Sequence, residues 1–94
     1  MKIYVHDPKD ENYFMDCCSA GVSCTKAELN ILVDGLIEFR SKIEKYVKNN
    51  PDESDYGETH MHYIDINESC KKSENDLIFI VDVNTAKNDD GTVI

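Results

Sequence analysis

Residues 25–48, TKAELNILVDGLIEFRSKIEKYVK, contain the clearest pattern in the chain and predict one amphipathic helix. Thr25 and Glu28 form a capping box, in which the threonine hydroxyl accepts from the N3 amide and the glutamate accepts from the cap amide. Pro51 disfavours helical geometry in the residue before it, so the helix is expected over 26–48. Apolar residues recur at steps of three and four and form one stripe: Leu29, Leu32, Leu36, Phe39, Ile43 and Tyr46 or Val47.

Four segments around this helix are rich in β-branched and aromatic residues, which favour strands. A short polar connection separates the first two segments, so we expect these two to form a hairpin. The last segment is apolar on both faces for half its length, which is typical of a strand in the centre of a sheet. The predicted strands are residues 2–6, 12–18, 59–66 and 76–83.

The order ββαββ predicts an α+β fold: a four-stranded, mostly antiparallel sheet with one long amphipathic helix on one face. A chain of 94 residues has room for one core. We therefore expect a single α+β domain over residues 1–84 and a polar, flexible tail over 85–94. Gly35 is expected to let the sheet approach the helix closely. The other face of the sheet is expected to stay open to solvent or to a partner.

The composition, with 40% hydrophobic and 31% charged residues, is that of a globular protein. The longest apolar run, Leu77–Val81, is far too short to span a bilayer. The N-terminal MKIYVHDPKDE lacks the apolar core and cleavage site of a signal peptide, so we expect a cytoplasmic protein.

The net charge of −9, from 19 acidic and 10 basic side chains, argues against a nucleic-acid binder, because affinity for phosphate comes chiefly from Lys and Arg. Such a field would accelerate the approach of a basic protein partner, although many small proteins are acidic for solubility alone. The acids are clustered, since residues 49–69 contain six of them and no Lys or Arg.

The cysteines are predicted to be reduced and mostly buried thiols, because free Cys behaves as a small hydrophobe. Their spacing is not that of a zinc site, and no export signal points to an oxidising compartment. The sequence leaves their redox state open. They stand at Cys17, Cys18, Cys24 and Cys70.

The stretch ETHMHYIDIN at 58–67 contains a His-x-His pair. In a strand, His60 and His62 would share one face with Ile64 and Ile66. This is the geometry of a strand-borne metal pair, but zinc needs at least a third protein ligand and second-shell partners. We therefore favour a structural or partner-facing role. If the isoleucines pack on the helix, the histidines are expected near the edge of that face.

No nucleophile elbow, Gly-rich phosphate loop or paired-carboxylate motif is present, so we predict no enzyme, no catalytic residues and no cofactor. The acidic loop after the helix contains a tyrosine with no periodic element to bury it, and Tyr is enriched at protein interfaces. We expect this loop and the following strand to bind a protein. The predicted partner-binding residues are Asp52, Glu53, Asp55, Tyr56, Glu58, His60, His62 and Asp65.

Three segments, KAELNILVDGLIEF, GETHMHYID and SENDLIFIVDVN, resemble a small immunity-protein family of bacterial polymorphic toxin systems, immunity protein family thirty-two. The resemblance covers about residues 25–84. It implies a cytoplasmic antitoxin that binds a cognate toxin domain and blocks it, and it implies no catalytic residues. The positions that match are Gly35 and Leu36, His60 and His62, Asp65, and Leu77 with Ile78.

Two other functions remain open from the sequence. One is a small metal-binding domain that uses His60 and His62. The other is an acidic inhibitor of a nucleic-acid-binding protein, although the acids are not spaced like phosphates. The sequence also leaves open the identity of the partner and whether the protein is a monomer or a homodimer, since an unpaired edge strand could pair by sheet extension.

Overall fold

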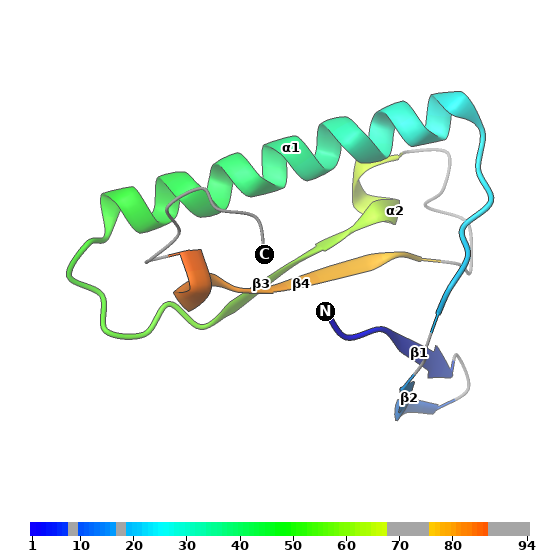
Figure 1. Cartoon of the computed structure of the whole chain (residues 1–94), viewed down its shortest axis with the longest axis horizontal. Helices are drawn as coiled ribbons and strands as arrows, with labels where there is room; N and C mark the ends of the chain where they lie inside the picture. Colours follow the sequence, from blue (N-terminus) through cyan, green and yellow to red (C-terminus); the bar gives the residue numbers. More distant parts are fainter. Residues whose placement is uncertain (8–9, 17–18, 68–75, 87–94) are drawn as a thin grey trace.

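The computed structural model describes residues 1–7, 10–16, 19–67 and 76–86, and for residues 5–7 and 10–16 it describes the backbone alone. A long helix runs above two hairpins (Figure 1). The elements, in chain order, are β1 (Tyr4–Asp7), β2 (Asp10–Asp16), α1 (Lys26–Asn49), β3 (Glu58–His62), α2 (Tyr63–Ile66), β4 (Ile78–Asp82) and the 3-10 turn η2 (Val83–Ala86).

The predicted helix is confirmed as α1, together with its capping box. The Thr25 hydroxyl accepts from the amide of Glu28 at 3.1 Å, and the Glu28 carboxylate accepts from the amide of Thr25 at 2.9 Å. These hydrogen bonds from Thr25 lower the pKa of Glu28. The 24 residues of α1 span about 36 Å at 1.5 Å per residue. Within the described ranges, no helix combines the length and the apolar content that a membrane span requires.

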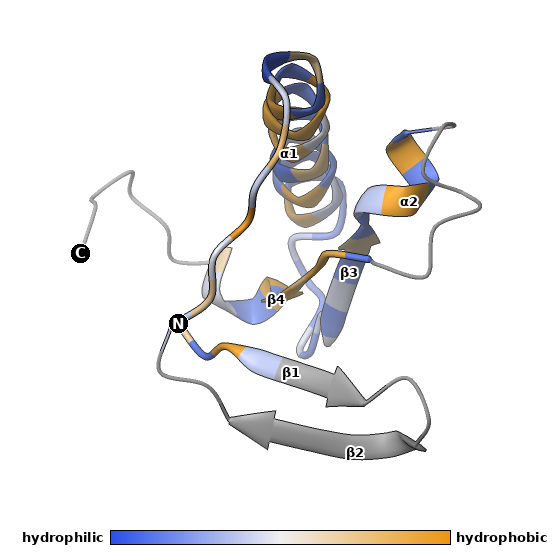
Figure 2. Cartoon of the chain, turned by 90° about the vertical axis from the view of Figure 1, so that its right-hand side faces the viewer, coloured by the Kyte–Doolittle hydropathy of each residue, from blue (hydrophilic) through white to orange (hydrophobic). Residues whose placement is uncertain are grey.

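The prediction of one four-stranded sheet is wrong. β1 pairs with β2 and β3 pairs with β4, both antiparallel, as two separate two-stranded sheets. The β1–β2 hairpin lies on the side of β3–β4 that is opposite α1 (Figures 1 and 2). Among the described strands β4 therefore has one neighbour, β3, and is not central. The reason is physical: an apolar pattern specifies which face of a strand is buried, but not which strand lies beside it.

The predicted strand over 59–66 is too long, because Tyr63–Ile66 form the helical turn α2. Two hydrogen bonds hold this turn. The amide of Asn67 donates to the carbonyl of Tyr63 at 3.2 Å, and the amide of Ile64 donates to the carboxylate of Asp76 at 3.1 Å. The side-chain alternation of β3 therefore stops at His62, and the isoleucines do not continue the histidine face.

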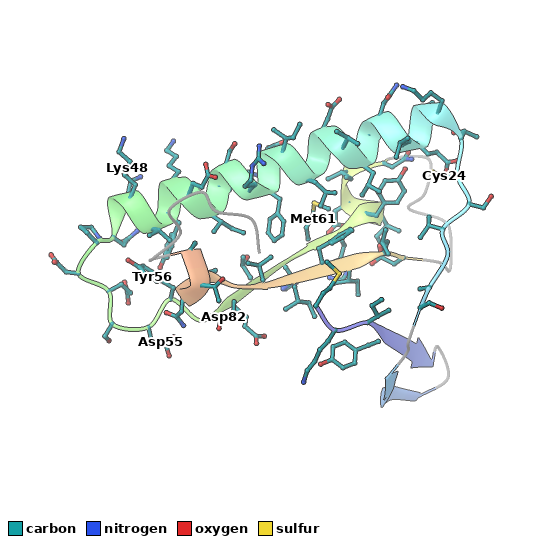
Figure 3. All side chains as sticks on the ribbon, viewed as in Figure 1. Cys24, Lys48, Asp55, Tyr56, Met61 and Asp82 are labelled. Carbon is teal, nitrogen blue, oxygen red and sulfur yellow. The ribbon has the colours of Figure 1, made fainter. Side chains whose placement is uncertain are left out.

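The side of β3–β4 that faces α1 carries half-buried side chains, including Met61 and Phe79, and it ends at the buried Val83. Met61 lies in the space between β3 and α1 (Figure 3), which identifies this side. The hydroxyl of Tyr63 in α2 also donates to the carbonyl of Glu28 on α1 at 3.2 Å. On the opposite side the exposed His60 is paired with Ile80, whose side chain is 60% exposed. The histidine face therefore points away from the helix, contrary to expectation.

Backbone hydrogen bonds at both ends of β3–β4 fix its register. Tyr63 donates to the carbonyl of Leu77 at 2.9 Å, and Val83 donates to the carbonyl of Gly57 at 2.9 Å. Bonded and non-bonded pairs alternate along an antiparallel ladder. Residues 59 and 61 of β3 therefore bond to β4, whereas residues 58, 60 and 62 turn their backbone amides away from it.

Some predictions fall outside the described residues, among them residues 87–94 of the predicted tail and the thiols of Cys17, Cys18 and Cys70. Cys24 is described, and it is exposed rather than buried.

Gly35 permits a close approach, but of α2 rather than of a strand. A Cβ atom at this position would overlap Cδ1 of Ile66. The missing side chain lets Ile66 pack directly on the backbone of α1, and this contact joins α2 to the helix.

A double-mutant cycle tests this contact. In an open helix, Gly35→Ala should stabilise by about 1 kcal/mol. Overlap with Ile66 should cancel this gain and destabilise the protein by about 1 kcal/mol. In an Ile66→Ala background the same substitution should stabilise. Urea denaturation measures both effects, and equal effects in the two backgrounds would contradict the contact.

Candidate functional site

An open cleft of about 680 Å³ runs along the outer edge of β3, beneath α1. It is bounded by residues 35–46 of α1 and by residues 56–66, and we call it the β3 cleft. None of the lining residues belongs to β4, so the cleft lies on the β3 side of the two-stranded sheet. Figure 3 shows Met61 in the space between β3 and α1.

The β3 cleft brings together five of the eight predicted partner-binding residues. Its lining includes Tyr56, Glu58, His60, His62 and Asp65. The other three lie in the preceding loop, where their side chains are exposed and are not part of this lining: Asp52, Glu53 and Asp55.

Tyr56 is a structural anchor at one end of the cleft. Its half-buried side chain donates from the hydroxyl to the carbonyl of Asn50 at 2.6 Å. Its ring packs edge-on against Tyr46 with centroids 5.9 Å apart, and its amide donates to Oδ1 of Asn84 at 2.9 Å. Tyr56 therefore ties the loop to α1 through its ring and to η2 through its amide.

Asp55 is also occupied within the loop. Its Oδ1 accepts from Nδ2 of Asn84 at 2.8 Å and from the amide of Gly57 at 2.9 Å. Both bonds lower the pKa of Asp55, and the bond from Asn84 has the larger effect. Gly57 has φ +67°, in the left-handed region that favours glycine, so the turn into β3 depends on it. We therefore regard Asp55 as a loop-fixing residue.

His62 is held by Asp76, which the sequence did not single out. Nδ1 of His62 lies 2.5 Å from Oδ2 of Asp76, and since an ionised carboxylate only accepts, the imidazole donates. Oδ1 of Asp76 also accepts from the amides of Ile64 and Leu77, at 3.1 and 2.9 Å. Partial burial opposes ionisation of Asp76, but the bonds from His62, Ile64 and Leu77 outweigh it and lower the pKa of the carboxyl. No sequence spacing signals a contact across fourteen residues.

His60 and His62 are in ring contact, with centroids 5.0 Å apart and planes at 82°. They supply two imidazoles for a metal. In the described part of the chain, no three His, Cys, Asp or Glu side chains gather as a metal-binding group. Of the other residues that could supply a third ligand, Glu58 is described, whereas Cys17, Cys18 and Cys70 lie outside the described residues.

The rim of the β3 cleft is acidic, and its floor, the inner surface between α1 and β3 that includes Phe39, Ile43 and Met61, is apolar. Glu38 and Lys42 on α1 form an exposed ion pair at 3.2 Å, which leaves Glu58 and Asp65 as the further charged groups of the lining. Glu58 also stands directly opposite Asp82 in the β3–β4 pair. Like charges directly opposite each other are destabilising, so a basic group nearby would relieve the repulsion.

Comparison of the chain with protein-family models, with curated proteins and with solved structures gives no match.

The role of Asp76 is tested through the pH dependence of stability. Its folded pKa is lowered, so its contribution is fully present above the unfolded pKa of about 3.9 and is lost as the pH falls through the folded value. At neutral pH, Asp76→Asn should reduce the free energy of unfolding by about 1–2 kcal/mol, and the difference from the native chain should shrink below about pH 4.

Asp65→Asn is the matched control, because Asp65 is exposed and lies on the neighbouring turn. Urea unfolding at a series of pH values should show little effect of this control. A loss that is the same at every pH for Asp76→Asn would contradict the assignment.

Proposed function

We propose that this chain is a protein-binding module that acts as an immunity protein: it binds a cognate bacterial toxin domain in the cytoplasm and blocks it by occlusion, without catalysis. The observation that carries protein binding is the β3 cleft, an open site of about 680 Å³ with an apolar floor and an acidic rim. The resemblance of residues 25–84 to the immunity-protein family supplies the class of partner.

Exposed apolar side chains support a protein partner. Leu29, Val33 and Ile37 repeat every four residues along α1 and are 43%, 46% and 48% exposed. Among the residues whose side chains are described, Val83 is the one buried apolar side chain. A protein that leaves so much of its apolar surface in water gains from burying it against another protein.

Charge supports a basic partner. The net charge is −9, and the exposed acids Asp52 and Glu53 precede the acidic rim of the β3 cleft along the chain. Long-range attraction of this kind accelerates encounter and disfavours acidic partners. The docking contacts themselves would come from the cleft.

Growth rescue tests the proposed function. The proposal expects the gene to lie beside a large reading frame whose C-terminal domain arrests growth when expressed alone. Coexpression of this chain should restore growth, and the two purified proteins should form a stable complex. An arrest that continues despite soluble expression of the chain would contradict the immunity function.

A charge-reversal pair tests electrostatic steering by the acidic loop. Asp52→Lys should slow association with the toxin domain by about 3- to 10-fold at low salt, and the loss should fade as salt screens the charges. Asp34→Lys on α1 is the control, because it changes the net charge equally at another exposed position. Stopped-flow kinetics would contradict loop steering if both variants slowed association equally.

A further inference from the structure

The outer edge of β3 is an unpaired backbone edge inside the β3 cleft. The register turns the amides of Glu58, His60 and His62 and the carbonyls of Glu58 and His60 away from β4. In the described part of the chain, β4 is the one strand that pairs with β3. All three residues belong to the lining of the cleft. The cleft therefore has a wall of backbone donors and acceptors as well as an apolar floor.

The two edges of the β3–β4 sheet differ. On β4, the carbonyl of Asp82 accepts from the hydroxyl of Thr85 at 2.6 Å, and the chain then turns into η2. At the edge of β3, no side chain among the described residues donates to the carbonyls of Glu58 or His60. Of the two edges, the edge of β3 is the one that lines the β3 cleft.

The geometry points to strand addition: an extended segment of a partner protein, with alternating apolar and basic residues, binds along β3 in the cleft as a third strand. This inference rests on the proposed protein-binding function and assigns its binding mode. Main-chain hydrogen bonds would provide affinity, and alternate side chains would provide specificity. Addition would also widen the two-stranded sheet beneath α1 to three strands.

The alternation of apolar and basic residues in the partner segment follows from the different surroundings of the two sides of the new strand. Side chains on its upper side would contact the apolar side chains between α1 and β3, which include Phe39, Ile43 and Met61. Side chains on its lower side would lie on the histidine face near Glu58, which is already opposed by Asp82. Basic residues fit there, because they relieve the repulsion between these two carboxylates.

The test uses a synthetic ten-residue peptide in which Lys alternates with Val and Phe. Amide hydrogen exchange is measured by NMR with and without the peptide. On binding, exchange at the amides of Glu58, His60 and His62 should slow by at least about tenfold. Two control peptides should bind at least about tenfold more weakly: one with Glu in place of Lys, and one that is N-methylated along one edge.

Two substitutions at one position separate the backbone from the side chain. His60→Pro removes an outward amide without removing a bond to β4, which is the position where an edge strand tolerates proline. It should weaken peptide binding by at least about tenfold, while His60→Ala should retain most of the affinity. Protection of the Thr59 and Met61 amides checks that the β3–β4 pair is intact in each variant.

Several outcomes would overturn the inference. Peptide binding that leaves the three amides unprotected would show attraction to the acidic surface without strand addition. Slow exchange at these amides before peptide is added would show that the edge is filled by the chain itself or by a second copy. Equal binding of the N-methylated peptide would also contradict it.

The two proposals fail separately. Toxin neutralisation without protection of the three amides by the toxin or the peptide would keep the immunity function and reject the strand-addition mode. Protection by the peptide without rescue from a toxin would keep the binding site and reject the immunity function.

Discussion

The antiparallel register of β3 and β4 is the constraint on which the rest of the molecule depends. It places Met61 opposite Phe79 on the side of α1, and His60 opposite Ile80 on the other side. Because the side-chain period of a strand is two, a slip of one residue would exchange these faces. The same register decides which backbone amides bond to β4 and which face the cleft. Packing and the candidate site are therefore two consequences of one pairing.

The second constraint is the mismatch between a broad helix and a narrow sheet. α1 carries apolar residues beyond the stripe that contacts the two strands. One flank of these lines the β3 cleft, and the other exposes Leu29, Val33 and Ile37. The core of the described residues is thin as a result. A binding partner at the edge of β3 would give the helix the wider support that its own sheet does not provide.

Local signals in the sequence predict the elements that depend on local interactions. The capping box, the period of the apolar residues and Pro51 place α1 to within one residue of its observed end. The first two strands form the expected hairpin. The joining of both hairpins into one sheet could not be predicted correctly, because pairing between distant strands is not contained in the pattern of either strand.

The candidate site shows the same division between local and distant contacts. The acidic residues and the His-x-His pair mark the segment that forms one wall of the β3 cleft, and the sequence identifies them. The burial of Tyr56 against Tyr46 and the bond between His62 and Asp76 were not foreseen. Each is a contact between separate segments of the chain. The helical turn of α2, although built from residues with strand propensity, depends on Asp76.

The most direct measurement of the central claim is the set of Hα–Hα NOEs across the β3–β4 pair. Non-hydrogen-bonded antiparallel pairs bring their Cα atoms to about 4.5 Å, compared with about 5.5 Å in bonded pairs. Strong NOEs are expected for Glu58–Asp82 and His60–Ile80, and none of this strength for Thr59–Val81. Strong NOEs at Thr59–Val81, or from β1 or β2 to the outer edge of β3, would contradict this claim.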